Sequence, residues 1–196
     1  MKYFKNLKQA TLVSVVFLLI CGLGFPMLLT GISQVIFPYQ ANGSLIEYEG
    51  EKIGSEHVGQ DFNEPYFMKG RPSAVGYNTA DEVVDVASGS NNYAPSNELL
   101  KERVQEDMDT FLEQNPDVKK EDIPTDLLTA SGSGLDPHIS VDSALIQIPA
   151  ISKASGISES ELEKIVEENT EGKLLGIFGE NTVNVLKVNL EIAKRL

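Results

Sequence analysis

TLVSVVFLLICGLGFPMLLTGISQVIF, from Thr11 to Phe37, is the stretch that decides the architecture of this 196-residue chain. It lies in a longer segment without a charged side chain, between Lys8 and Glu47. A helix of this length and polarity can cross a hydrocarbon core about 30 Å thick. The stretch therefore predicts a transmembrane helix over residues 10–37, preceded by a short N-terminal segment of residues 1–9.

Two other fates of an N-terminal apolar segment fit this sequence less well. A cleaved signal peptide has an apolar region of about 7–15 residues and then a small-residue cleavage site. Here the run is longer, and no A-x-A motif follows it. Lipidation of Cys21 is disfavoured because bulky Ile20 precedes it and apolar residues continue beyond it. We expect an uncleaved single-span anchor.

Basic residues predict the orientation of this anchor. Three lysines, at positions 2, 5 and 8, precede the span, and the first basic residue after it is Lys52. The positive-inside bias then places residues 1–9 in the cytoplasm and residues 38–196 outside the cell membrane. Because Cys21 is the one cysteine of the sequence, the exported domain cannot form a disulfide.

The span carries small residues and a proline that a lone anchor does not need. Small residues let a second helix approach closely, and a proline kinks a helix unless neighbours satisfy the freed carbonyl group. These features suit a span that packs against other membrane helices. The residues are Gly22, Gly24, Pro26, Thr30, Gly31 and Ser33.

The exported part of the chain is strongly acidic. The chain has 16 Lys and Arg against 29 Asp and Glu, and three of the lysines precede the span. From Glu47 onward, 13 basic and 29 acidic residues remain, a formal charge of −16. Nucleic-acid binding draws much of its affinity from basic side chains on phosphates, so a nucleic-acid partner is excluded.

Helical patterns appear at three places in the exported domain. Ser96 or Asn97 can cap a helix that runs to about Gln114, with Leu100, Val104, Met108 and Phe111 on one face. A second helix begins at Ser140, with Ala144, Leu145, Ile148 and Ile151 on one face and Pro149 bending it. A third begins at the capping box Ser158-x-x-Glu161 and carries Leu162, Ile165 and Val166.

Strand patterns complete the predicted fold. Aromatic residues and punctuating prolines and glycines over Phe62–Asn78 predict a brief strand that leads into an ordered loop. In TVNVLKVNLEIA (182–193), apolar Val188, Leu190 and Ile192 alternate with polar Lys187, Asn189 and Glu191, which favours a strand, while a helix stays open as the alternative. The expected fold is one N-terminal transmembrane helix followed by a small mixed α/β (α+β) extracytoplasmic domain over residues 38–196.

The stretch SGSGLDPHIS (131–140) holds the raw material of a nucleophilic site. Ser133 lies between Gly132 and Gly134, but a G-x-S-x-G elbow needs a glycine where this chain has Ser131. Asp136 and His138 are near neighbours in the chain, whereas triad members come from separated segments. A loop built to a shape, ending in a helix cap at Ser140, is the better interpretation.

Other chemistry finds little support in the sequence. His57 and His138 lack a partner at metal-ligand spacing, so no metal site is expected. The phosphate-binding motif G-x-x-x-x-G-K-[ST] does not occur. We therefore expect no cofactor of the chain's own.

Several short stretches occur together in one order along nearly the whole chain. They are FMKGRPS (67–73), GSN (89–91), PSN (95–97), TASGSGLDPHIS (129–140), QIP (147–149) and VNVL (183–186). In these stretches the chain closely resembles the C subunit of the Kdp-type potassium-transporting ATPase of bacteria. It departs from that family's usual pattern at Ala94, Val141 and Ala150.

The resemblance implies a non-catalytic accessory subunit of an ATP-driven potassium uptake complex in the cell membrane. The family is described as a catalytic chaperone that raises the ATP affinity of the pump subunit and stabilises the complex outside, against the potassium-binding subunit. Implied partners are a channel-like potassium-binding subunit, a P-type ATPase subunit, a small membrane peptide and membrane lipid. The complex would use ATP and carry potassium, and direct contact of this chain with ATP is not expected.

No catalytic residue is implied, and the D-K-T-G motif of P-type pumps is absent from the sequence. The family's signature, read as a partner-binding or structural set, falls on nine residues: Gly70, Arg71, Pro72, Ser131, Gly132, Ser133, Gly134, Asp136 and His138. Two alternatives stay open. One is an anchored exported serine hydrolase using Ser133 and His138, and the other is a free-standing anchored binding protein.

Overall fold

The computed structural model describes residues 2–79 and 86–196. It divides into two compact units, residues 1–52 and residues 53–196. The first unit is built around a long helix, and the second contains most of the short helices and a small sheet. This is the α+β arrangement with an N-terminal apolar helix that the sequence predicts.

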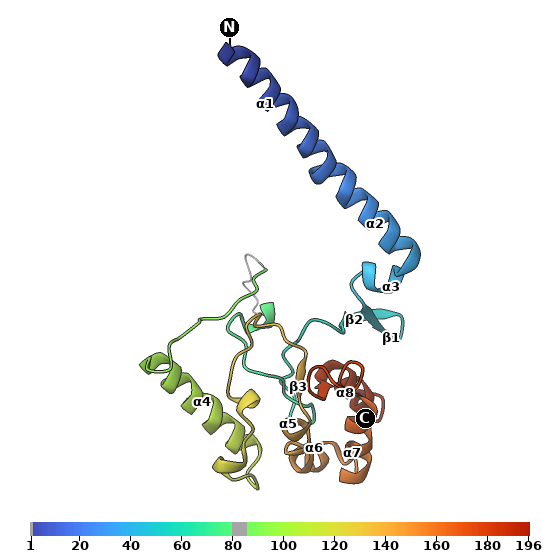
Figure 1. Cartoon of the computed structure of the whole chain (residues 1–196). Helices are drawn as coiled ribbons and strands as arrows, with labels where there is room; N and C mark the ends of the chain where they lie inside the picture. The colour runs from blue at the N-terminus through green and yellow to red at the C-terminus, as the bar shows by residue number, and fades with distance from the viewer. Residues whose placement is uncertain (1, 80–85) are drawn as a thin grey trace. The chain divides into compact units, whose positions relative to one another are not determined.

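The long helix of the first unit consists of α1 (Lys2–Leu19), the π-helical turn η1 (Ile20–Gly24) and α2 (Phe25–Ile36) in direct succession. Figure 1 shows them as one continuous rod. Its apolar part has a mean hydropathy of 2.6, and none of it is buried. Among the described residues, Tyr3–Ile36 is the one helix long and apolar enough to cross a membrane.

The π-helical turn explains how the rod passes Pro26. Proline has no N–H and its ring crowds the carbonyl of the preceding turn. Directly before it, the Phe25 amide donates to the Ile20 carbonyl, five residues back. This wider turn absorbs the disturbance locally, as π-bulges in helices commonly do, so the helix continues instead of breaking.

A short hairpin follows the rod. After α3 (Pro38–Ala41), strands β1 (Leu45–Tyr48) and β2 (Glu51–Ser55) form a two-stranded sheet. The two residues between them, Glu49 and Gly50, have φ of 52° and 86°. Two successive positive φ values are the mark of the tight turn that matches the twist of paired strands.

The second unit combines one longer helix, several short ones and a three-stranded sheet. In chain order its elements are η2 (Gly76–Asn78), α4 (Glu98–Gln114), η3 (Lys120–Asp122), η4 (Thr125–Leu127), β3 (His138–Ser140), α5 (Val141–Leu145), α6 (Ile148–Ser155), α7 (Glu159–Glu168), β4 (Thr170–Glu171), β5 (Thr182–Asn184) and α8 (Val185–Ala193). The sheet order is β3-β5-β4, and both pairings are antiparallel.

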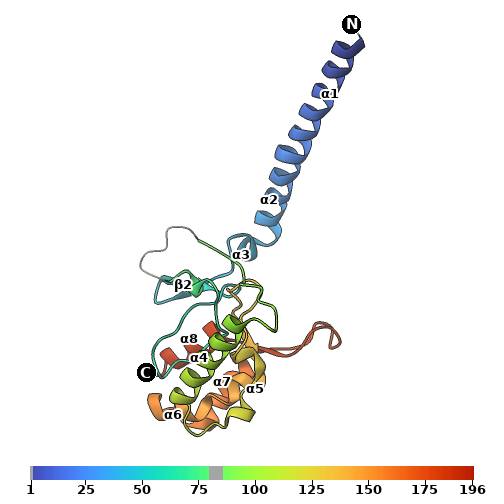
Figure 2. The same ribbon diagram turned by 90° about the vertical axis from the view of Figure 1, so that its left-hand side faces the viewer.

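The core of this unit lies between the small sheet and helices α5–α8, which Figures 1 and 2 show grouped together. Its members are aliphatic, and Met68 joins them from a segment without regular structure. The set is Met68, Ile139, Ala144, Ile148, Ile151, Ile157, Leu162, Ile165, Val166, Val183, Val185, Val188 and Ile192.

The first and third predicted helices and all three predicted helix starts are confirmed, together with their caps. The Asn97 side chain accepts from the Leu99 amide at the start of α4, which ends at Gln114. The Ser140 side chain accepts from the Ser143 amide at the start of α5. The Ser158 side chain accepts from the Glu161 amide at the start of α7. These caps satisfy amides that have no partner within the first helical turn.

The second of these helices is interrupted rather than merely bent. Pro149 lies in the first turn of α6, so the chain forms two short helices, α5 and α6. Ile148 and Ile151 are buried as predicted. Leu145 is not part of that buried face, since 41% of it is exposed.

The predicted C-terminal strand is wrong over most of its length. Only Thr182–Asn184 is extended, and α8 begins directly after it. The Asn184 side chain accepts from the Lys187 amide and so caps this helix. Val185, Val188 and Ile192 are buried at helical spacing, a pattern that the alternation of apolar residues concealed.

The brief strand predicted within Phe62–Asn78 is also wrong. The segment contains turns and one 3-10 turn. Its backbone pairs with side-chain amides instead of a neighbouring strand. The Met68 amide donates to Asn189 Oδ1 (2.7 Å) and its carbonyl accepts from Asn189 Nδ2 (2.9 Å). Gln147 makes the equivalent pair with Lys69, at 2.8 and 3.2 Å.

Candidate functional site

Arg71 joins the two stretches that carry most of the sequence signature. Its Nη1 donates to Asp136 Oδ2 at 3.0 Å. Its Nε and Nη2 donate to the Thr129 carbonyl at 3.3 and 3.2 Å. Both charged side chains are about three-quarters covered, with 24% and 28% exposed. A partly desolvated pair with this many bonds fixes the geometry of both loops.

Asp136 is held as a carboxylate by its neighbours. Its Oδ1 accepts from the His138 amide at 3.0 Å and lies 3.6 Å from the His138 Nδ1. Hydrogen bonding from the His138 side chain, with the His138 amide and Arg71 adding to it, lowers the pKa of Asp136 despite partial burial. The negative charge therefore persists below the usual range of a carboxyl group.

The backbone of the SGSGLDPHIS stretch is bonded on two sides by other loops. The Gly89 amide donates to the Ser133 carbonyl (2.7 Å), and the Gly59 amide donates to the Leu135 carbonyl (2.8 Å). The Ser73 hydroxyl donates to the Gly134 carbonyl (2.6 Å). The stretch is thus held by hydrogen bonds from Gly59, Ser73 and Gly89.

Gly134 is required by this close packing. Its φ is 68°, and a Cβ at this position would lie 2.8 Å from the Gly89 carbonyl oxygen and 2.9 Å from Val75 Cγ2. Gly132 differs, because a Cβ there would meet nothing within 4 Å. The two glycines of one motif therefore have unequal structural roles.

Tyr77 forms hydrogen bonds within the other signature stretch, residues 70–77. Its hydroxyl donates to the Arg71 carbonyl, and its amide donates to Ser73 Oγ at 3.0 Å. Burial, with a contribution from Asp136, raises the pKa of Tyr77 to about 12. Gly70 lies against the same ring, since a Cβ there would be 3.0 Å from the Tyr77 hydroxyl oxygen. Pro72 lines two hollows beside this stretch.

Ser133 and His138 do not form the pair that a serine hydrolase needs. Ser133 Oγ accepts from the Leu135 amide (3.1 Å) and lies 3.4 Å from Ser131 Oγ. His138 Nε2 lies 3.4 Å from Asn184 Nδ2, and its Nδ1 faces Asp136. Both ring nitrogens of the histidine thus face groups other than the serine, so no base is positioned to activate it.

Ser131 stabilises the turn in which it lies. It is buried, and its Oγ accepts from the Gly134 amide at 2.9 Å. Within residues 2–79 and 86–196, no group of three or more His, Cys, Asp or Glu side chains could hold a metal ion. In the signature loops, meaning residues 70–77 and 129–138, the polar side chains Arg71, Ser131 and Asp136 are thus bonded within the loops.

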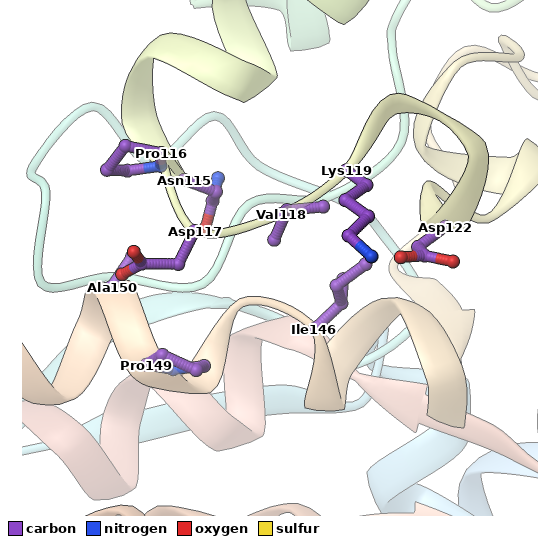
Figure 3. A pocket seen from close by; sticks show the side chains of 9 residues that line it. All are labelled: Asn115, Pro116, Asp117, Val118, Lys119, Asp122, Ile146, Pro149 and Ala150. Carbon is purple, nitrogen blue, oxygen red and sulfur yellow. The ribbon is translucent and has the colours of Figure 1, made fainter.

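A separate hollow of about 240 Å³ lies between the loop after α4 and helices α5 and α6 (Figure 3). Its wall is largely aliphatic, including Val118, Ile146 and Pro149. Among its nine lining residues, Lys119 is the one cation. A nucleoside triphosphate needs several hydrogen-bond donors that converge on its phosphates, and the lining of this hollow does not offer them.

Comparison with known proteins matches almost the whole chain. The family model described as "K+-transporting ATPase, c chain" matches residues 7–194. The chain belongs to the KdpC family.

Curated KdpC relatives align over nearly their full length. A protein of Clostridium kluyveri is 61% identical over 99% of this chain and 96% of its own length. A protein of Clostridioides difficile is 59% identical over 98% of both chains. One of Caldanaerobacter subterraneus is 43% identical over 98% of this chain and 96% of its own. Each of the three is named potassium-transporting ATPase KdpC subunit.

Sequence reasoning found part of what organises the site in this KdpC-family chain. It selected Arg71 and Asp136, which the structure brings together. It missed Tyr77, Gly59 and the two amide side chains Gln147 and Asn189. The last two carried a signal, because each polar residue interrupts an otherwise apolar helical face that packs into the core.

Proposed function

We propose that this chain is a non-catalytic accessory subunit of an ATP-driven potassium uptake complex. The observation that carries the proposal is the family match over residues 7–194, which includes the apolar helix as well as the second unit. The relatives' shared name, potassium-transporting ATPase KdpC subunit, supports it.

We further propose a topology. Residues 10–37 cross the cell membrane once, residues 1–9 are cytoplasmic, and residues 38–196 lie outside. The three lysines before the span and their absence from the next forty residues support this orientation. In intact cells, a membrane-impermeant maleimide should label Glu121→Cys and not Lys5→Cys, both made in a Cys21→Ala background. The reverse pattern would overturn the topology.

The role proposed for the subunit is to raise the ATP affinity of the pump subunit and to stabilise the complex at the outer face of the potassium-binding subunit. An outside domain cannot contact cytoplasmic ATP, so the effect must pass through packed membrane helices. Gly31 supports such packing, since it has no side chain that would keep a neighbouring helix at a distance.

The nine signature residues are proposed to shape the domain that the partners meet, instead of performing chemistry. Support comes from Arg71 and Asp136, which bond to each other, and from Ser131 and Ser133, which bond within their own turn. The complex would use ATP and carry potassium, while this chain holds neither.

The test compares the transporter purified with and without this chain. We expect the ATP concentration for half-maximal ATPase activity to rise when the chain is missing, and the other subunits to separate more readily in detergent. Unchanged ATP dependence and unchanged assembly would refute the proposal. A Ser133→Ala variant should keep potassium-limited growth, whereas a loss of some hydrolytic activity in that variant would favour the hydrolase alternative.

A further inference from the structure

The segment between β4 and β5 exposes an apolar tip. Its sequence is KLLGIFGE, from Lys173 to Glu180. Four large apolar side chains are exposed side by side: Leu174 by 70%, Leu175 by 82%, Ile177 by 75% and Phe178 by 62%. Figure 2 shows this segment, in the red-brown part of the colour range, projecting away from the helices of the second unit. Such a cluster marks an interaction surface.

The tip has a defined shape. Leu174 and Phe178 form an antiparallel bridge, with the Leu174 amide donating to the Phe178 carbonyl at 2.8 Å. The Gly176 amide donates to the Lys173 carbonyl at 2.9 Å. Leu175 has a φ of 54°, in the left-handed region that leucine rarely adopts. A strained and bonded turn presents its side chains in one arrangement, which a shaped protein surface can recognise.

The charge and composition of the tip favour a protein partner over a lipid surface. At the base of the tip, Lys173 Nζ lies 3.4 Å from Glu180 Oε2, so its one cation is already paired. The tip has neither Trp nor Tyr, the side chains enriched where proteins meet lipid headgroups. The domain from Glu47 onward carries −16, which an anionic bilayer surface repels. An uncharged cluster with an aromatic residue is typical of the centre of a protein–protein interface.

A hollow lies at the base of the tip. It measures about 360 Å³, and its lining combines apolar Val141 and Leu145 with the carboxylates Glu163 and Glu167. Because this hollow is partly acidic, the uncharged apolar surface is confined to the tip itself.

We propose that the tip, residues 173–180, docks into an uncharged, apolar surface of another chain of the transporter, outside the membrane. This inference rests on the proposed function, because it needs the other chains to be present. The apolar tip supplies the contact, and the Lys173–Glu180 pair keeps the base of the tip electrically neutral.

The experiment uses the full-length chain in the assembled complex. The domain has no cysteine of its own, so Leu175→Cys in a Cys21→Ala background places one thiol at the tip. Leu99→Cys, on exposed α4, is the matched control. Each variant is labelled with a water-soluble maleimide, once as the isolated chain in detergent and once in the complex.

We expect assembly to slow labelling of Leu175→Cys about tenfold, because a docked state favoured by that factor leaves the tip open about a tenth of the time. Leu99→Cys should be labelled equally in both forms. A benzophenone attached at Leu175→Cys should cross-link to another protein chain of the complex.

Equal labelling of Leu175→Cys in both forms, equal slowing of both variants, or cross-links to lipid alone would overturn the inference. The proposed function fails differently. If a tagged full-length chain brings no transporter subunit with it in mild detergent, the accessory-subunit proposal itself is wrong.

Discussion

The two glycines of SGSGLDPHIS, Gly132 and Gly134, allow a substitution and its control to be compared within one motif. In Gly134→Ala, the alanine backbone must adopt a φ of 68°, and its methyl group would lie 2.8 Å from the Gly89 carbonyl oxygen. The left-handed conformation costs roughly 1–2 kcal/mol for a residue with a Cβ, and overpacking adds about 1–3 kcal/mol. We expect the free energy of unfolding of the second unit to fall by about 2–5 kcal/mol, a large share of a typical total.

Gly132→Ala is the matched control, because its Cβ would meet nothing within 4 Å and its φ is not in the left-handed region. Its effect should stay within about 0.5 kcal/mol, as for most exposed substitutions. For both variants, urea unfolding of the full-length chain in detergent measures the change in stability. Amide hydrogen exchange in residues 129–138 then measures the local effect on the loop. Equal destabilisation by the two substitutions would refute the reasoning that close packing at Gly134 fixes this loop.

Three further substitutions test the contacts around the signature loops. Arg71→Met should cost about 2–3 kcal/mol, less than the loss of a fully buried pair because about a quarter of each side chain is exposed. Since the folded pKa of Asp136 is lowered, its stabilisation is present above its unfolded pKa of about 3.9 and is lost as pH falls through the folded value, so stability curves of wild type and variant should converge in acid. Tyr77→Phe should remove one late-titrating phenol, near pH 12, from the ultraviolet titration of the folded chain, and a titration unchanged by this substitution would contradict the assignment. Asn189→Leu should destabilise by about 2–4 kcal/mol, because it leaves the buried amide and carbonyl of Met68 unpaired, and exposed Gln105→Leu should change stability little.

Local signals in the sequence predicted the parts of the fold that depend on near neighbours. Caps at Asn97, Ser140 and Ser158 mark helix starts because each side chain bonds an amide two or three residues on. The apolar helix of the first unit can be predicted from the composition of its segment alone. These features require no knowledge of what lies elsewhere in the chain.

The errors arose where distant residues decide the local structure. Asn189 belongs to the polar set of the alternation that favours a strand, yet it is 1% exposed because it pairs with the Met68 backbone, 121 residues away. The same pairing replaces the strand predicted near Met68. Arg71 and Asp136 were both selected from the signature, but nothing local shows that they meet across 65 residues.

Gln147 and Asn189 also have a mechanical consequence. Gln147 directly precedes α6 and Asn189 lies within α8, and they bond to adjacent residues, Lys69 and Met68, of one segment without regular structure. Neither helix can shift along its axis without pulling the segment or breaking a pair of hydrogen bonds. Residues 68–69 therefore link the two helices through four hydrogen bonds, so that a displacement of one helix is expected to strain the bonds to the other.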